Sequence, residues 1–296
     1  MAGNLWTSAA WAGCARVADQ HHRKAQAYPQ SMTEPALGAA FFDLDKTILA
    51  KSSSLMFAKP FYDGGLIGRA DVLRSAYAQF VYLVSGADAD QMDQMRHYLS
   101  ALCRGWSVEQ VRAIVAETLD DLVEPVIYVE ADELIAHHRS SGREVIIISS
   151  SGTEVVEPIG DRLGVDLAVG TQMEIVDGLY TGEILFYAYG QGKADAMVEL
   201  ATSRGFDLAE SFAYTDSHTD LPMLELVGNP VAVNPDSDLR QIALDRGWPI
   251  LDFEKPVAMR SALSTPEAKA VAVGAVGAVG AAALSLAWYA ARRRGR

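Results

Sequence analysis

Cysteine and positive charge are scarce in this chain, and each scarcity excludes a class of protein. The two cysteines among its 296 residues, Cys14 and Cys103, are too few for a disulfide framework and predict a reducing compartment. Lysine and arginine together number 25 against 38 acidic residues, which gives a formal net charge of −13. Because a nucleic-acid binder needs basic surface to neutralise phosphates, we expect no nucleic-acid partner.

Apolar residues, in contrast, are plentiful. They make up 50% of the chain, which is too many for a disordered protein, and the length is sufficient for a large core. Met32 stands shortly before the first clean strand pattern and is an alternative start of the protein. The predicted divisions are a flexible N-terminal extension (1–37), an α/β core (38–50 and 126–252), a helical cap (51–125), a linker (253–269), an apolar helix (270–291) and a basic tail (292–296).

Short apolar runs alternate with helical patterns in the predicted core. The runs at 39–42, 144–148 and 212–214 are typical of buried strands, and a separate short strand is expected near 167–169. Asp177-Gly178 is flanked by alternating apolar residues, as in a hairpin. The alternation predicts an α/β fold with a Rossmann-like parallel sheet and helices on both faces. Ligands of such sheets bind beyond the carboxyl ends of the strands, so we expect the reactive side chains at those positions.

Two carboxylates follow the first predicted strand. Asp43 and Asp45 stand two residues apart, where an aspartate can attack phosphorus and where paired carboxylates suit Mg²⁺. A surface turn that happens to be acidic is the alternative explanation. On these two residues alone, both interpretations stay open.

The other predicted strand ends and helix starts also carry polar groups. The stretch at 149–152 predicts an anion site at the start of a helix, or else a plain helix cap. Lys193 begins a helix, where the dipole disfavours a cation, so it indicates a phosphate partner unless it is a solvated surface lysine. One of the carboxylates of Asp216 and Asp220 could bind a metal directly, and the other could hydrogen-bond to a metal ligand. We interpret His218, which stands between them, as a loop residue, because Mg²⁺ prefers oxygen ligands.

The order of these clusters resembles that of a known family. The run Phe42-Asp43-Leu-Asp45-Lys-Thr47, a strand ending in Ser149, then Lys193, then Asp216-x-x-x-Asp220-x-Pro222, is similar to the four motifs of the haloacid dehalogenase-like hydrolases. The long helical insert after the first motif resembles the phosphoserine phosphatase-like branch, which carries a helical cap there. The resemblance covers about residues 38–252.

The resemblance implies a role for each matching residue. Asp43 would be the nucleophile and a Mg²⁺ ligand. Asp45 would be the general acid and base, with its backbone carbonyl on the metal. The remaining implied roles are phosphate binding by Ser149, Ser150 and Lys193, metal binding by Asp216, and support of these groups by Asp220 and Thr47.

The chain departs from the phosphoserine phosphatases at several positions. Ser52 occupies the position of the glutamate that holds the serine amino group, Ser150 and Ser151 replace two glycines, and Thr219 replaces an asparagine. We therefore predict a Mg²⁺-dependent phosphomonoester hydrolase that forms an aspartyl phosphate on a small or lipid-linked ester. A phosphoserine phosphatase is the alternative, and a catalytically idle, membrane-bound interaction module is the alternative of another class.

The segment 270–291 predicts a membrane anchor. It contains no charged side chain over 22 residues, and Trp288 and Tyr289 stand beside a basic end. Three glycines, Gly274, Gly277 and Gly280, would allow close packing of two such helices in a homodimer. A buried or interfacial helix is the alternative. The prediction is a membrane-associated enzyme with its catalytic domain in the cytoplasm.

Overall fold

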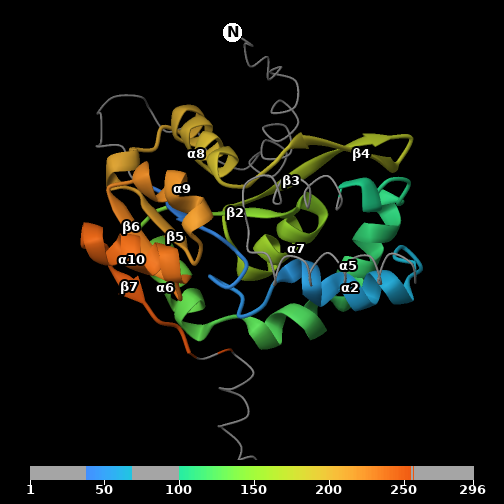
Figure 1. The fold of residues 1–296 in the computed structure, drawn as a ribbon, viewed down its shortest axis with the longest axis horizontal. Helices are drawn as coiled ribbons and strands as arrows, with labels where there is room; N and C mark the ends of the chain where they lie inside the picture. Colours follow the sequence, from blue (N-terminus) through green and yellow to red (C-terminus); the bar gives the residue numbers. More distant parts are fainter. Residues whose placement is uncertain (1–37, 69–99, 255, 257–296) are drawn as a thin grey trace, which may run out of the picture.

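Seven strands form one sheet in the order β4-β3-β2-β1-β5-β6-β7 (Figure 1). The computed structural model describes residues 38–68, 100–254 and 256. All neighbouring strands are parallel except β3 and β4, which confirms the predicted mainly parallel sheet. The strands are β1 (Ala40–Phe42), β2 (Val145–Gly152), β3 (Leu167–Val176), β4 (Leu179–Phe186), β5 (Phe212–Thr215), β6 (Asn229–Val233) and β7 (Ile250–Leu251).

Helices cover both faces of this sheet, as the sequence predicted (Figure 1). Side chains of α5, α6 and α7 pack in the core on one face, and those of α8, α9 and α10 pack on the other. The helices are α2 (Ser53–Asp63), α5 (Val108–Val123), α6 (Val129–Ser140), α7 (Thr153–Leu163), α8 (Gln191–Arg204), α9 (Leu221–Glu225) and α10 (Ser237–Arg246), with short 3₁₀ turns η1 (Glu124–Val126), η2 (Leu208–Glu210) and η3 (His218–Asp220).

Strand β1 shows how the alternation of side chains builds both cores. Phe42 belongs to the cluster under α5, α6 and α7, whereas Phe41 belongs to the cluster under α8, α9 and α10. Successive side chains of a strand point to opposite faces, so a strand at the centre of the sheet must be apolar throughout. Burial of a side chain of this size contributes roughly 1.5–3 kcal/mol, which fixes β1 and the residues that follow it.

The hairpin predicted at Asp177-Gly178 is confirmed. Both residues have positive φ angles, 51° and 78°, as the turn between two twisted strands requires. The expectation of a separate short strand near 167–169 was wrong, because β3 is one strand of ten residues. Its first half pairs with β2 and its second half with β4, so no turn separates them.

The tip of this hairpin also contacts the predicted cap. The backbone N–H of Tyr180 donates to the Trp106 carbonyl, and the N–H of Gly105 donates to the Tyr180 carbonyl. The N–H of Val108, the first residue of α5, donates to the Gly178 carbonyl. The hairpin is thereby joined by main-chain hydrogen bonds to the segment that leads into α5.

The described part of the predicted cap is helical and packs against the core. Phe57 of α2 and Val111 of α5 lie in the same buried cluster as side chains of the sheet. Arg112 of α5 also pairs with Glu154 of α7 at 3.5 Å. Residues 69–99 lie outside the described residues, and the division of the chain into core and cap stays a prediction.

The prediction of a membrane-associated enzyme is not supported, and we withdraw it. Across the described ranges, every helix is too short or too polar to cross a lipid bilayer. The apolar segment 270–291, on which the prediction depended, lies outside the described residues, as do the extension 1–37 and most of the linker. The homodimer that its glycines suggested stays a prediction.

His138 is a buried histidine whose protonation would oppose folding. It lies on α6 against the rings of Phe42 and Phe212, and its Nε2 is 2.8 Å from the hydroxyl oxygen of Tyr214. Burial, and then the nearby charges of Arg143 and His137, lower the pKa of His138 to about 4. The folded protein therefore holds this ring neutral at pH values where the unfolded chain protonates it.

We expect His138 to make the protein less stable as the pH falls from about 7 to 5. Between the folded and unfolded pKa values the unfolded chain binds more protons, so the free energy of unfolding drops by about 1–2 kcal/mol over this window. Urea unfolding at both pH values should show this loss in the wild type and a smaller one in His138→Gln. His137→Gln, a change at the exposed neighbouring position, removes only the smallest of the three causes of the low pKa, so its loss should stay close to that of the wild type. An equal loss in all three proteins would contradict the assignment.

Candidate active site

The carboxyl ends of three adjacent strands bring the predicted residues together. Asp43 follows β1, Asp216 follows β5, and Ser149 lies near the end of β2, while β1 pairs with both other strands. The N–H of Asp43 donates to the Tyr214 carbonyl at 2.9 Å, so the pairing with β5 continues up to the first catalytic candidate. This convergence is the geometry that the sequence predicted for the edge of a parallel sheet.

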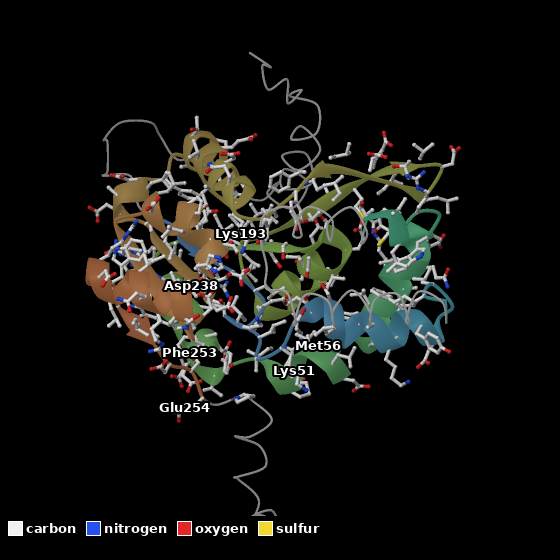
Figure 2. The ribbon with its side chains drawn as sticks, in the orientation of Figure 1. Lys51, Met56, Lys193, Asp238, Phe253 and Glu254 are labelled. Carbon is white, nitrogen blue, oxygen red and sulfur yellow. The ribbon has the colours of Figure 1, made fainter. Side chains whose placement is uncertain are left out.

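Lys193, which is labelled in Figure 2, contacts two carboxylates of the site. Its Nζ is 2.6 Å from Asp43 Oδ1 and 2.6 Å from Asp220 Oδ2, and all three side chains are buried. Thr215 Oγ1 donates to the same oxygen of Asp220 at 2.7 Å. The positive end of the helix dipole repels a cation in the first turn of a helix. The hydrogen-bonded carboxylates of Asp43 and Asp220 compensate for this repulsion at Lys193.

Burial also shapes the charges of this site. It raises the pKa of Asp43, although Lys193 acts in the opposite direction, and it raises the pKa of Asp216 to about 6. Burial opposes the charge of Lys193 as well, but Asp220 and Asp43 outweigh it and raise the pKa of the ammonium. The site therefore holds more buried carboxylates than its one buried ammonium can neutralise.

Asp45 faces the start of α2. Its Oδ1 accepts a hydrogen bond from the backbone N–H of Ser53 at 2.8 Å, and Ser52 Oγ lies 3.4 Å from its Oδ2. Burial raises the pKa of this carboxyl, and the N–H of Ser53 lowers it. Asp45 is thus held at the N-terminal end of the first helix of the predicted cap.

The serine stretch after the second predicted strand differs from expectation. Strand β2 continues through Gly152, and helix α7 begins at Thr153 rather than at Ser149. The pairing of Gly152 with Thr171 of β3 extends the strand, and Thr171 Oγ1 donates to the Ser150 carbonyl at 2.8 Å. Ser149 is buried in the site, whereas the side chain of Ser150 is exposed.

Thr47, Asp216 and His218 complete the predicted set. Thr47 is buried with Oγ1 3.4 Å from Asp43 Oδ2, and the exposed Lys46 reaches to 3.9 Å from Asp216. His218 lies in η3 with Nδ1 3.0 Å from Asp236 Oδ2, in agreement with its interpretation as a loop residue. Within residues 38–68, 100–254 and 256, no group of three or more His, Cys, Asp or Glu side chains is arranged to bind a metal.

Three residues of the site were not predicted from their chemistry. Ser53 and Thr215 make hydrogen bonds within it, and Ser52 entered the sequence analysis only as a departure from a motif. A hydroxyl residue beside a motif aspartate is the signal that would have indicated Thr215. Ser53 and Ser151 are 98 positions apart, and no local pattern joins them.

The chain belongs to the haloacid dehalogenase-like hydrolase family, whose model matches residues 40–225. It is a phosphatase of this family, which favours an enzyme over the alternative of a catalytically idle interaction module. The family match spans the sheet and the strand ends at which Asp43, Lys193 and Asp216 meet.

The relatives that match most of the chain include three proteins from two organisms. A Streptomyces azureus protein named "inhibition of morphological differentiation protein" is 60% identical over 260 residues, which cover 86% of this chain and 94% of the relative. A Mycobacterium tuberculosis protein named "probable phosphatase" is 52% identical over 266 residues, which cover 90% and 93%. Another protein from M. tuberculosis, named "phosphoserine phosphatase", is 36% identical over 261 residues, which cover 87% and 82%.

Proposed function

We propose that this protein is a Mg²⁺-dependent phosphomonoester hydrolase that acts through an aspartyl phosphate on Asp43. The observation that carries the proposal is the buried ammonium of Lys193, 2.6 Å from a carboxylate at the carboxyl end of the central strand. Phosphoryl transfer depends mostly on positioning and on neutralising oxygen charge, and this lysine is placed for both.

The donor set fits Mg²⁺. The carboxylates of Asp43 and Asp216 and the backbone carbonyl of Asp45 are hard oxygen ligands, of the kind that Mg²⁺ binds together with water and substrate phosphate. Burial raises the pKa of both carboxyls because it disfavours their negative charge, and a bound cation would compensate for this cost. When bound, the metal would supply further neutralisation of the phosphoryl oxygens.

The two aspartates divide the chemistry between them. A carboxylate oxygen of Asp43 forms a bond to phosphorus while the bond from phosphorus to the ester oxygen breaks, and Asp45 gives its proton to that oxygen. In the second step Asp45 takes a proton from water as the water oxygen attacks phosphorus. Inorganic phosphate leaves and Asp43 regains its carboxylate. Ser149 and Lys193 hold the phosphoryl oxygens in both steps.

A small phosphate ester is the substrate class that we propose. With membrane association withdrawn, no observation favours a lipid-linked ester. A phosphoserine phosphatase is the second candidate, because a relative that is 36% identical carries that name. Ser52 argues against it, since a hydroxyl in place of a carboxylate offers no counter-charge for an amino group.

A screen of phosphate esters tests this proposal. We expect Mg²⁺-dependent release of phosphate from at least one small ester, complete loss of activity in EDTA, and recovery when Mg²⁺ is added back. Phosphoserine belongs in the screen as one arm, and preference for it would favour the second candidate. A protein that releases no phosphate from any ester with Mg²⁺ would overturn the proposal.

A further inference from the structure

Two buried serines connect the predicted cap to the phosphate end of the site. Ser53 Oγ, on the first residue of α2, lies 2.7 Å from Ser151 Oγ near the end of β2, and both side chains are buried. Ser54 Oγ lies 3.2 Å from the same oxygen of Ser151. We call Ser53 and Ser151 the serine pair.

Each member of the serine pair also contacts a residue of the active site. The backbone N–H of Ser53 donates to Asp45 Oδ1 at 2.8 Å, and the backbone N–H of Ser151 donates to Ser149 Oγ at 3.3 Å. A continuous path of hydrogen bonds therefore joins Ser149, which we propose to bind the phosphoryl group, to Asp45, which we propose to protonate the leaving group.

We propose that the serine pair positions Asp45 for protonation of the leaving oxygen. The inference rests on the proposed function. The bond between Ser53 Oγ and Ser151 Oγ fixes the start of α2 against β2, and the Ser53 N–H then fixes the orientation of the Asp45 carboxyl. An acid contributes to catalysis only when its proton lies within hydrogen-bond reach of the leaving oxygen. A small displacement of α2 would therefore slow proton transfer from Asp45 to that oxygen.

The chemistry of the pair favours positioning over simple packing. Apolar side chains fill a buried space without any need for hydrogen-bond partners, whereas buried hydroxyls are stable only when they are paired. The pair spans 98 residues of sequence and joins the start of α2 to the end of β2. Because each serine also donates its backbone N–H to a motif residue, the directional bond between them links the acid site to the phosphate site. Ser151 also occupies a position where the resembling phosphatases carry glycine, so this bond is a feature of the present chain.

The dependence of the rate on the leaving group tests this role. We would compare p-nitrophenyl phosphate, whose phenolate leaves without a proton, with phenyl phosphate, whose more basic oxygen requires one. In Ser53→Ala and Ser151→Ala we expect the ratio of kcat/KM for phenyl over p-nitrophenyl phosphate to fall about tenfold. A merely structural role would lower both rates together and leave the ratio unchanged.

Two further variants make the comparison decisive. Ser53→Thr keeps a hydroxyl and should restore the wild-type ratio, and Ser140→Ala, an exposed serine on α6, should not change it. Thermal unfolding shows which variants fold, and the two alanine variants serve as independent tests.

The outcomes separate this inference from the proposed function. If Asp45→Asn lowers the ratio but neither serine variant does, the serine pair has no positioning role. If the wild type is active but Asp45→Asn leaves the ratio unchanged, the acid role of Asp45 is wrong. A wild type inert toward both esters contradicts the proposed function and the inference with it.

Discussion

Replacement of Asp43 by asparagine is expected to lower kcat by more than about 10⁴-fold while the protein stays folded. The amide has nearly the same shape as the carboxylate and removes the charged oxygen that would attack phosphorus. Steady-state release of phosphate, with whichever ester the wild type hydrolyses best, measures the loss. Asp245→Asn, the same change at an exposed position on α10, should retain wild-type activity.

The covalent intermediate supplies a second readout for Asp43. Acid quenching during turnover, followed by peptide mass spectrometry, should locate a phosphoryl group on the peptide that contains Asp43. Asp45→Asn should accumulate this species from p-nitrophenyl phosphate, because it lacks the base that activates water for the second step. Activity of Asp43→Asn above about 1% of the wild type, or a phosphoryl group on another residue, would contradict the mechanism.

Lys193→Met is expected to lower the free energy of unfolding by about 3–5 kcal/mol, besides abolishing activity. The change leaves Asp43 and Asp220 buried without the ammonium that both now contact at 2.6 Å. Urea unfolding at neutral pH measures the loss. Lys59→Met removes an exposed lysine that pairs with Asp63 on α2, and this control should cost less than about 1 kcal/mol.

The pH dependence of Lys193→Met distinguishes lost charge from lost packing. Without the ammonium, protonation of the buried carboxylates relieves their repulsion in the folded state more than in the unfolded chain. The folded state then binds more protons, so the stability deficit should shrink as the pH falls from about 7.5 to 5.5. A second variant, Lys193→Met with Asp220→Asn, should recover part of the loss. A deficit that is independent of pH and unchanged in the double variant would show that packing alone is responsible.

The parallel sheet and the main residues of the site could be predicted because each leaves a local signal. A buried parallel strand is an apolar run, and a polar residue at its end is visible without knowledge of the rest of the fold. Asp43 and Asp216 are predicted in this way, whereas Lys193 is predicted from its position at the start of a helix and from the order of the motifs. Their convergence follows from the rule that parallel strands end at one edge.

Contacts between distant segments could not be predicted in the same way. The hydroxyl pair of Ser53 and Ser151 depends on how α2 lies against β2, and neither residue has a local pattern that indicates its partner. The full length of β3 was missed because its two halves pair with different neighbours. The start of α7 was placed too early because serine is a favoured cap, while pairing with β3 keeps residues 149–152 in the strand.

The contacts of the β3–β4 hairpin limit the insertions and deletions that its two strands can tolerate. Its tip carries the carbonyls of Gly178 and Tyr180, which accept hydrogen bonds from the segment before and at the start of α5. Addition of one residue to either strand between Ile175 and Tyr180, where the pairing is regular, would turn the later side chains to the opposite face and move these carbonyls out of register. Insertions and deletions at this end of the hairpin should therefore be rare among descendants of this sequence, and those that occur should lie near Gln172 and Met173, where the register already shifts.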